Sequence, residues 1–154
     1  MSPRGPSTVL VVDTNILLAL LLGRQRNTDR LRRLILSDRD VVATEHTRTE
    51  LIRVYAALRP TLMADSIRSA EAVLESVQVL PMDVYSDRMA AAATCLRLAV
   101  PSRNGSTGDA HILALAWHLD ADIWSGDRDF AGTGWPSWSS ANLYRAIIPD
   151  GDWD

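Results

Sequence analysis

Four acidic residues stand at positions that would bring their carboxylates together in a parallel-sheet fold: Asp13, Glu50, Asp109 and Asp127. Asp13 directly follows an apolar, β-branched run, and Asp127 follows a second apolar run after one glycine. A lone aspartate after a strand is commonly a helix cap, so no one of these acids identifies a site by itself. Together they predict a shared site, because ligands of such sheets bind beyond the carboxyl ends of the strands.

Carboxylates that lie within a few ångströms repel one another, so some must take up protons or a cation must bind between them. Hard divalent ions such as Mg²⁺, or Mn²⁺ in its place, prefer oxygen ligands and keep bound water. One or two such ions can activate a water molecule and stabilise charge on a phosphate during in-line displacement. We therefore predict that the four acids are metal ligands, either directly or through water.

The elements that must position these acids follow from the hydrophobic pattern. Strands are predicted at 8–12, 41–43, 77–80, 121–125 and 143–148. Helices are predicted at 16–22, 28–36, 45–58, 62–76, from 83 or 86 to 98, and from 109 through the apolar segment AHILALAWHL. Strands that alternate with helices favour the α/β class, with a parallel sheet covered on both faces.

The length fits one domain, residues 1–154, with a core over 7–149 and an acidic tail at 150–154. Cys95, the only cysteine, is interpreted as a small buried hydrophobe in a reduced compartment. No apolar run approaches the roughly 20 residues of a membrane span, so we expect a cytoplasmic protein with no membrane association.

The charge pattern does not by itself indicate a nucleic-acid partner, because the formal net charge is −3. All 16 basic residues are arginines. Arg48, Arg53 and Arg103 are the candidates for phosphate contacts because they lie beside or near acid-bearing segments; surface ion pairs are the alternative for each. Trp135 and Trp138 could stack on bases, plug the core or form a dimer contact.

The histidines are expected to be structural. His46 precedes Glu50 by one helical turn and could touch the site, whereas His111 and His118 lie two turns apart on one predicted helix. No third ligand at a zinc-binding spacing is recognised in the sequence.

Other phosphate chemistries lack their required residues. A receiver domain needs an active-site lysine, which the chain does not contain. A phosphatase with a nucleophilic aspartate carries a second aspartate two positions later, where this chain has Asn15. The P-loop pattern is absent, and no long basic insertion of the kind expected in a DNA-flap nuclease is present.

The sequence resembles the PIN-domain nucleases, especially the bacterial VapC toxins, at the same four acids. The matching segments, in order, are VVDTNILL at 11–18, HTRTEL at 46–51, GDAHILALA at 108–116 and SGDRDF at 125–130. They place the family's metal ligands at Asp13, Glu50, Asp109 and Asp127, with Asp129 as an auxiliary acid. Ser125 stands where the family often has threonine, and the Trp-rich end with the tail DGDWD departs from the core motifs.

The resemblance implies a PIN-like α/β/α sandwich with a five-stranded parallel sheet. It also implies a Mg²⁺- or Mn²⁺-dependent endoribonuclease that cleaves single-stranded or looped RNA and leaves 5′-phosphate and 3′-hydroxyl ends. The expected partners are RNA, a cognate antitoxin and a second copy of the chain. Thr14, Asn15 and Ser125 would orient carboxylates or a phosphate, or else cap helices and form turns. The alternative function is a catalytically silent RNA-binding or protein-interaction module.

Overall fold

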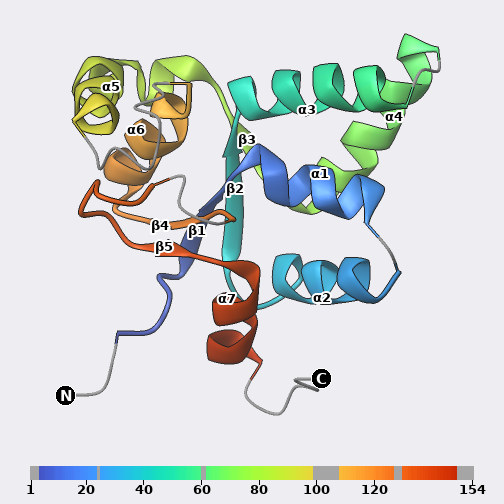
Figure 1. Cartoon of the computed structure of the whole chain (residues 1–154), viewed down its shortest axis with the longest axis horizontal. Coiled ribbons are helices and arrows are strands. Elements are labelled where there is room, and N and C mark those ends of the chain that lie inside the picture. The colour runs from blue at the N-terminus through green and yellow to red at the C-terminus, as the bar shows by residue number, and fades with distance from the viewer. Residues whose placement is uncertain (1–3, 24, 60–61, 99–107, 127–129, 149–154) are drawn as a thin grey trace.

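The computed structural model describes residues 4–23, 25–59, 62–98, 108–126 and 130–148. Five parallel strands form one sheet in the order β3-β2-β1-β4-β5 (Figure 1). The strands are β1 (Val9–Val12), β2 (Asp40–Thr44), β3 (Gln78–Leu80), β4 (Asp122–Trp124) and β5 (Ser137–Trp138). The α/β class and the five-stranded parallel sheet expected from the sequence are therefore confirmed.

Helices connect the strands. They are α1 (Thr14–Leu22), α2 (Gln25–Ile35), α3 (Glu45–Leu58), α4 (Met63–Val73), α5 (Met89–Arg97), α6 (Ala110–Leu119) and α7 (Ser140–Ile147), with short 3-10 turns η1 (Leu74–Ser76), η2 (Met82–Val84) and η3 (Ser86–Arg88). No described helix is long and apolar enough to cross a membrane. The predicted helix at 45–58 has the observed bounds of α3, and the predicted helix that starts at 83 or 86 instead begins with η2 and η3 before α5.

Alternating side chains of the strands build two cores, one on each face of the sheet. In β1, Leu10 and Val12 face the core formed with α1, α2, α3, α4 and α7, whereas Val11 faces the core formed with α5 and α6. In β4, Ile123 and Trp124 divide between the two cores in the same way. The ribbon shows α5 and α6 on one side of the sheet and the first four helices on the other (Figure 1). The result is an α/β/α sandwich.

One predicted strand was wrong. The segment 143–148 is not the fifth strand but lies mostly in α7, and the fifth strand is the two-residue β5 just before it. Ser139 begins this helix by accepting a hydrogen bond from the backbone N–H of Asn142. Leu143 and Tyr144 are buried, and α7 packs against α2. The short apolar run fits either period, and the capping serine decides for the helix.

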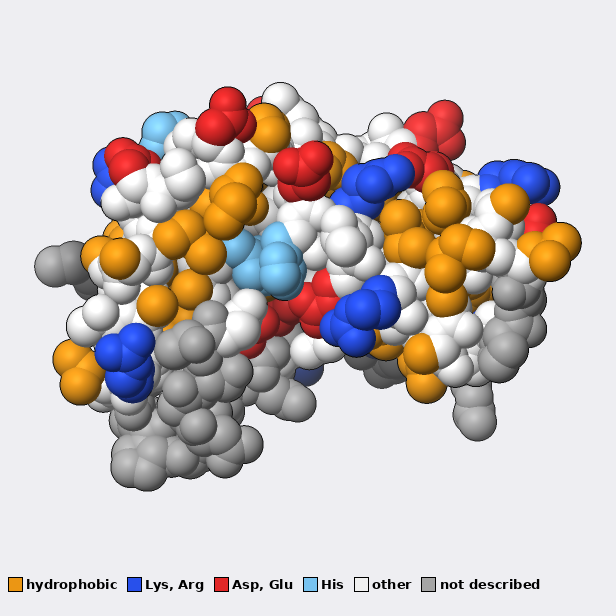
Figure 2. All heavy atoms as spheres, turned by 90° about the horizontal axis from the view of Figure 1, so that it is seen from above, with side chains coloured by type: hydrophobic (Ala, Val, Ile, Leu, Met, Phe, Trp, Pro, Cys, Tyr) orange, Lys and Arg blue, Asp and Glu red, His pale blue; other side chains and the backbone are white. Residues whose placement is uncertain are grey.

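All strands run toward the same end of the sheet, and in Figure 1 β1 and β2 rise toward the top of the view whereas β4 and β5 run across it. We call this end the carboxyl edge; it comprises the ends of β1, β2 and β4 and the residues that directly follow them. Figure 2 looks down on this side of the molecule, where histidine and acidic side chains gather near the middle of the face.

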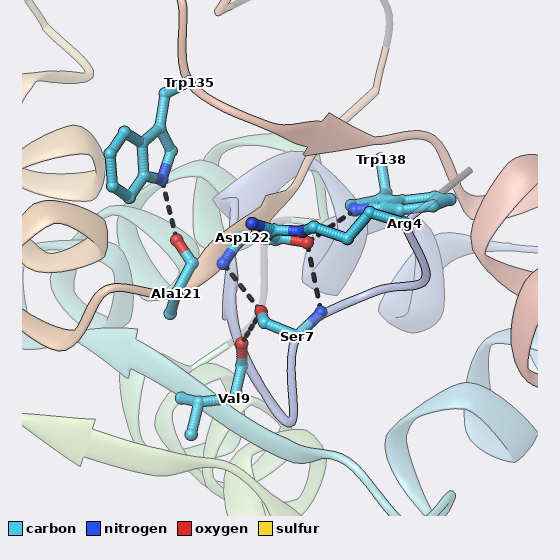
Figure 3. A network of polar contacts seen from close by, with 7 residues as sticks. All are labelled: Arg4, Ser7, Val9, Ala121, Asp122, Trp135 and Trp138. Atoms are coloured by element: carbon cyan, nitrogen blue, oxygen red, sulfur yellow. Dashed lines mark hydrogen bonds and ion pairs between the residues drawn. The ribbon is translucent and has the colours of Figure 1, made fainter. Parts of the chain in front are cut away.

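The opposite end of the sheet is held by a network around Asp122, the first residue of β4 (Figure 3). Its buried carboxylate pairs with Arg4 and accepts hydrogen bonds from the backbone N–H of Ser7 (3.1 Å) and from Trp138 Nε1 (2.9 Å). The Asp122 backbone N–H donates to Ser7 Oγ at 2.8 Å. The network thus links the segment before β1 to β4 and β5.

Replacing Asp122 is therefore expected to be costly. Asp122→Ala should lower the free energy of unfolding by about 2–4 kcal/mol, because it removes a buried carboxylate that holds together two partly buried donors and an arginine. Urea denaturation followed by circular dichroism measures this change. Asp38→Ala is the matched control, since Asp38 is 77% exposed and pairs with its sequence neighbour Arg39 at the surface. Equal stability of the two variants would contradict a structural role for the network.

Candidate active site

The register of the sheet brings the ends of β1 and β4 side by side. Val12 pairs with Trp124, and the backbone N–H of Asp13 donates to the Trp124 carbonyl at 2.9 Å. The next residue on each strand is a polar one, and the two meet: Ser125 Oγ donates a hydrogen bond to Asp13 Oδ2 at 2.7 Å. Both side chains are buried, at 3% and 1% exposure. Ser125 thus has the geometry expected of a hydroxyl that orients a carboxylate.

Neither of the two aspartates that precede helices caps its helix with its side chain. Asp13 is the N-cap residue of α1, and Asp109 is the N-cap residue of α6, yet no side-chain capping hydrogen bond forms in either case. Capping is the ordinary reason for an aspartate at this position. At Asp13 and Asp109, helix capping by the side chain therefore does not account for the aspartate.

Glu50 reaches the same region from α3. Thr44 ends β2 and caps α3, its hydroxyl accepting the backbone N–H of Thr47 at 2.9 Å. The helix that starts there carries His46 and Glu50 one turn apart, with His46 Nε2 and Glu50 Oε2 3.8 Å from each other. Glu50 is one-third exposed, so its carboxylate borders solvent.

His111 lies in the first turn of α6 at the carboxyl edge. The sequence predicts a structural role for it. It is 2% exposed, its ring centroid lies 4.2 Å from that of His46, and its Nδ1 lies 2.7 Å from Thr44 Oγ1. Burial, and to a lesser extent His46, lowers the pKa of His111 to about 3, so the ring is neutral at physiological pH. Nε2 is buried and has no hydrogen-bond partner.

The structure brings together a group of three side chains that was not predicted as a set. Among the described residues, the group of potential metal ligands whose donor atoms all lie within 4.8 Å of one another is His46, Glu50 and His111. Within the same part of the chain, Asp13, Glu50 and Asp109 do not form such a group. The sequence shows no zinc-binding spacing that would predict this group of His46, Glu50 and His111. The residues are close only in space: α6 packs against β2, and Thr44 at the end of β2 contacts His111.

Several predicted residues lie outside the described part of the chain: Asp127, Asp129 and Arg103. Of the others, Thr14 is buried with its hydroxyl unpartnered, and Asn15 is exposed. Arg48 Nε donates to Glu71 Oε1 at 2.8 Å. This is a surface ion pair, the alternative considered for Arg48 in place of a phosphate contact. Arg53 is exposed.

Trp135 and Trp138 make structural contacts. Trp135 Nε1 donates to the carbonyl of Ala121 at 2.7 Å, and Trp138 belongs to β5 and donates to Asp122 (Figure 3). Of the roles considered for them, these contacts match packing against the core.

The PIN domain family matches residues 10–136 of the chain. The chain belongs to the PIN domain family. Its matched region begins in β1 and ends just before β5, so it contains Asp13, Glu50 and Asp109. No curated protein matches the sequence.

Solved structures resemble this PIN domain over most of its length. VapBC-1 from nontypeable Haemophilus influenzae aligns with a TM-score of 0.62 and 24% identity, covering 86% of this chain and 98% of that one. Mycobacterium tuberculosis VapC20, described as a Sarcin-Ricin loop cleaving toxin, gives 0.60 and 23%, covering 82% and 95%. VapBC2 from Rickettsia felis bound to a DNA fragment gives 0.63 and 13%, covering 85% and 98%. These likenesses establish the PIN fold.

Three of the predicted metal ligands of this PIN domain carry side chains of the kind that binds a hard divalent ion. Asp13, Glu50 and Asp109 offer carboxylate oxygens, the ligands that Mg²⁺ and Mn²⁺ prefer. The buried Thr14 hydroxyl, next to Asp13 and without a partner, is a polar atom that a water molecule on an ion would satisfy.

The hydrogen bond between Ser125 and Asp13 generates a test. Ser125→Ala should weaken Mn²⁺ binding by about 10–100-fold, because the buried carboxylate loses the donor that orients it. Isothermal titration calorimetry of the purified chain measures the affinity. Ser125→Thr, which keeps the hydroxyl, should bind Mn²⁺ nearly as the parent does; an alanine variant with parental affinity would show that the hydrogen bond does not support the ion.

Proposed function

We propose that the chain is a Mg²⁺- or Mn²⁺-dependent endoribonuclease that cleaves single-stranded or looped RNA. Membership of the PIN domain family supports a nuclease, and the likeness to a toxin described as cleaving the Sarcin-Ricin loop supports RNA as the substrate class. The observation that carries the proposal is the state of Asp13. Asp13 is 3% exposed, directly follows the central strand β1, and does not cap its helix with its side chain.

A buried carboxylate is unfavourable unless hydrogen bonds or a cation compensate for the lost solvation. Ser125 supplies one donor to Asp13. A divalent ion would supply further compensation, and Asp13, Glu50 and Asp109 would hold it directly or through water. Asp127 as a further ligand, and Asp129 as an auxiliary acid, are proposed from the sequence motif alone.

The reaction is hydrolysis of a phosphodiester by in-line attack of water, which forms a bond to phosphorus as the bond to the 3′ oxygen breaks. When bound, a divalent ion activates the water and stabilises the charge on phosphate and leaving oxygen. The chain's residues have positioning roles. Asp13 is fixed by Ser125, Asp109 by its place before α6, and Glu50 by a helix that Thr44 caps.

The proposed phosphate contacts are Arg48, Arg53 and Arg103. Arg53 is exposed on α3, one turn beyond Glu50. Arg48 is engaged with Glu71, so an approaching phosphate would have to replace that carboxylate. Arg103 remains a candidate on the sequence alone.

We propose further that the enzyme is the toxin of a toxin–antitoxin pair. Structures of a toxin–antitoxin complex from Klebsiella pneumoniae and of VapBC-1 cover 85% and 86% of this chain. Around the junction of α3 and α4, Leu58, Leu62 and Met63 are each more than half exposed. Groups of exposed apolar side chains mark contact surfaces. We therefore propose that a cognate antitoxin binds this region and that the chain forms a homodimer.

The nuclease proposal predicts the effect of removing one charge. Asp13→Asn should lower Mn²⁺-dependent RNA cleavage by about 100-fold or more, because the buried carboxylate can no longer hold the ion. The thermal midpoint should stay the same or rise, since like-charge repulsion at the carboxyl edge is relieved. The asparagine side-chain carbonyl can still accept the Ser125 hydroxyl, so the local packing is kept.

Cleavage is measured on a panel of structured RNAs with purified protein and product analysis by gel electrophoresis. Asp83→Asn, which changes an exposed acid of η2, is the matched control and should cleave as the parent does. Undiminished cleavage by Asp13→Asn would remove Asp13 from the mechanism. A parent protein that binds RNA but cleaves none of the panel would favour the silent RNA-binding module instead.

A further inference from the structure

The cluster of His46, Glu50 and His111 has a donor set unlike that of the four acids. We call it the His–Glu–His cluster. It offers two imidazole nitrogens and one carboxylate oxygen within 4.8 Å of one another. Hard ions such as Mg²⁺ favour all-oxygen sites, whereas imidazole suits zinc and related first-row transition metals.

His111 Nδ1 lies 2.7 Å from Thr44 Oγ1, a hydroxyl that can accept a hydrogen bond from the ring. In the tautomer that carries its proton on Nδ1, the lone pair is on Nε2. Nε2 is the ring nitrogen that is buried without a hydrogen-bond partner. An imidazole held by a hydrogen bond at one nitrogen, with a lone pair at the other, has the arrangement of a metal-binding histidine.

The other two members can close on an ion. A tetrahedral zinc ion with bonds of about 2.0–2.2 Å needs donors roughly 3.3 Å apart, and the His46 and Glu50 donors are already 3.8 Å apart. The His46 side chain is 60% exposed and that of Glu50 is 32% exposed, so both have room to move. His111 is the fixed member, because it is buried at the start of α6.

We propose that the His–Glu–His cluster is a binding site for a first-row transition-metal dication of the zinc class. Three protein ligands leave the fourth position for water or a substrate atom. A purely structural histidine would not require Nε2 to be buried without a partner, and an ion gives that atom a partner. The site depends on these three side chains alone and does not require the chain to be a nuclease. It shares Glu50 with the proposed hard-ion site.

The test uses Zn²⁺ titration of the purified full chain by calorimetry, with Co²⁺ as a spectroscopic probe. We expect one ion per chain and visible Co²⁺ absorption bands of a site with nitrogen ligands. His46→Ala, which changes an exposed residue and should fold normally, should weaken Zn²⁺ binding at least about tenfold, since it removes one of three ligands. His111→Gln should do the same, and its circular dichroism spectrum reports whether it folds.

Two control variants distinguish the His–Glu–His cluster from binding positions elsewhere on the chain. His118→Ala changes an exposed histidine at the other end of α6 and should bind Zn²⁺ as the parent does. Asp13→Asn should also keep Zn²⁺ binding, because Asp13 is not a member of the cluster. Loss of binding in Asp13→Asn, or parental binding in His46→Ala, would overturn the proposal and place the ion among the acids or elsewhere. If the parent protein binds Zn²⁺ but cleaves no RNA, the nuclease proposal fails and the proposal of a metal site at the His–Glu–His cluster stands.

Discussion

The position of β1 between two parallel neighbours is the constraint on which the rest of the structure depends. β2 and β4 pair with it on either side, and its last three residues are completely buried between the two cores. This strand carries no polar side chain, and the first polar side chain after it is the Asp13 carboxylate. The parallel register sets the neighbours of that carboxylate, because the residue that follows β4 must lie beside the one that follows β1. Ser125 is that residue, and its hydroxyl points to Asp13.

A second polar centre depends on Thr44, the last residue of β2. Its hydroxyl accepts the backbone N–H of Thr47 and so starts α3, and the same oxygen lies within hydrogen-bond distance of His111 on α6. One buried side chain thus sets the start of the helix that carries Glu50 and the orientation of an imidazole from the opposite layer. Helices from the two sides of the sheet meet over the end of β2, and their polar residues form the His–Glu–His cluster there.

Most of the architecture could be predicted from the sequence, because buried parallel strands appear as short apolar runs between helical patterns. Four of the five strands lie within one or two residues of their predicted positions. The error at 143–148 arises because a short apolar run fits a strand or a helix equally well, and only the capping serine separates the two. At the candidate site, Asp13 and Asp109 precede α1 and α6 and Glu50 lies within α3, and their role as metal ligands stays a prediction. The association of His111 with His46 and Glu50 could not be predicted, since it joins residues more than 60 positions apart through the packing of α6 on β2.

The brevity of β4 has a consequence for how variants of this protein must be interpreted. Asp122, which anchors the N-terminal segment and Trp138, is separated by only two residues from Ser125, which contacts Asp13. In such a short strand, a substitution that shifts the backbone at one end is expected to shift the other end as well. Random screens for variants that lose the proposed activity would therefore recover substitutions around Arg4, Ser7 and Trp138 alongside those at the proposed metal ligands. Only a comparison of activity per folded molecule would tell the two kinds apart.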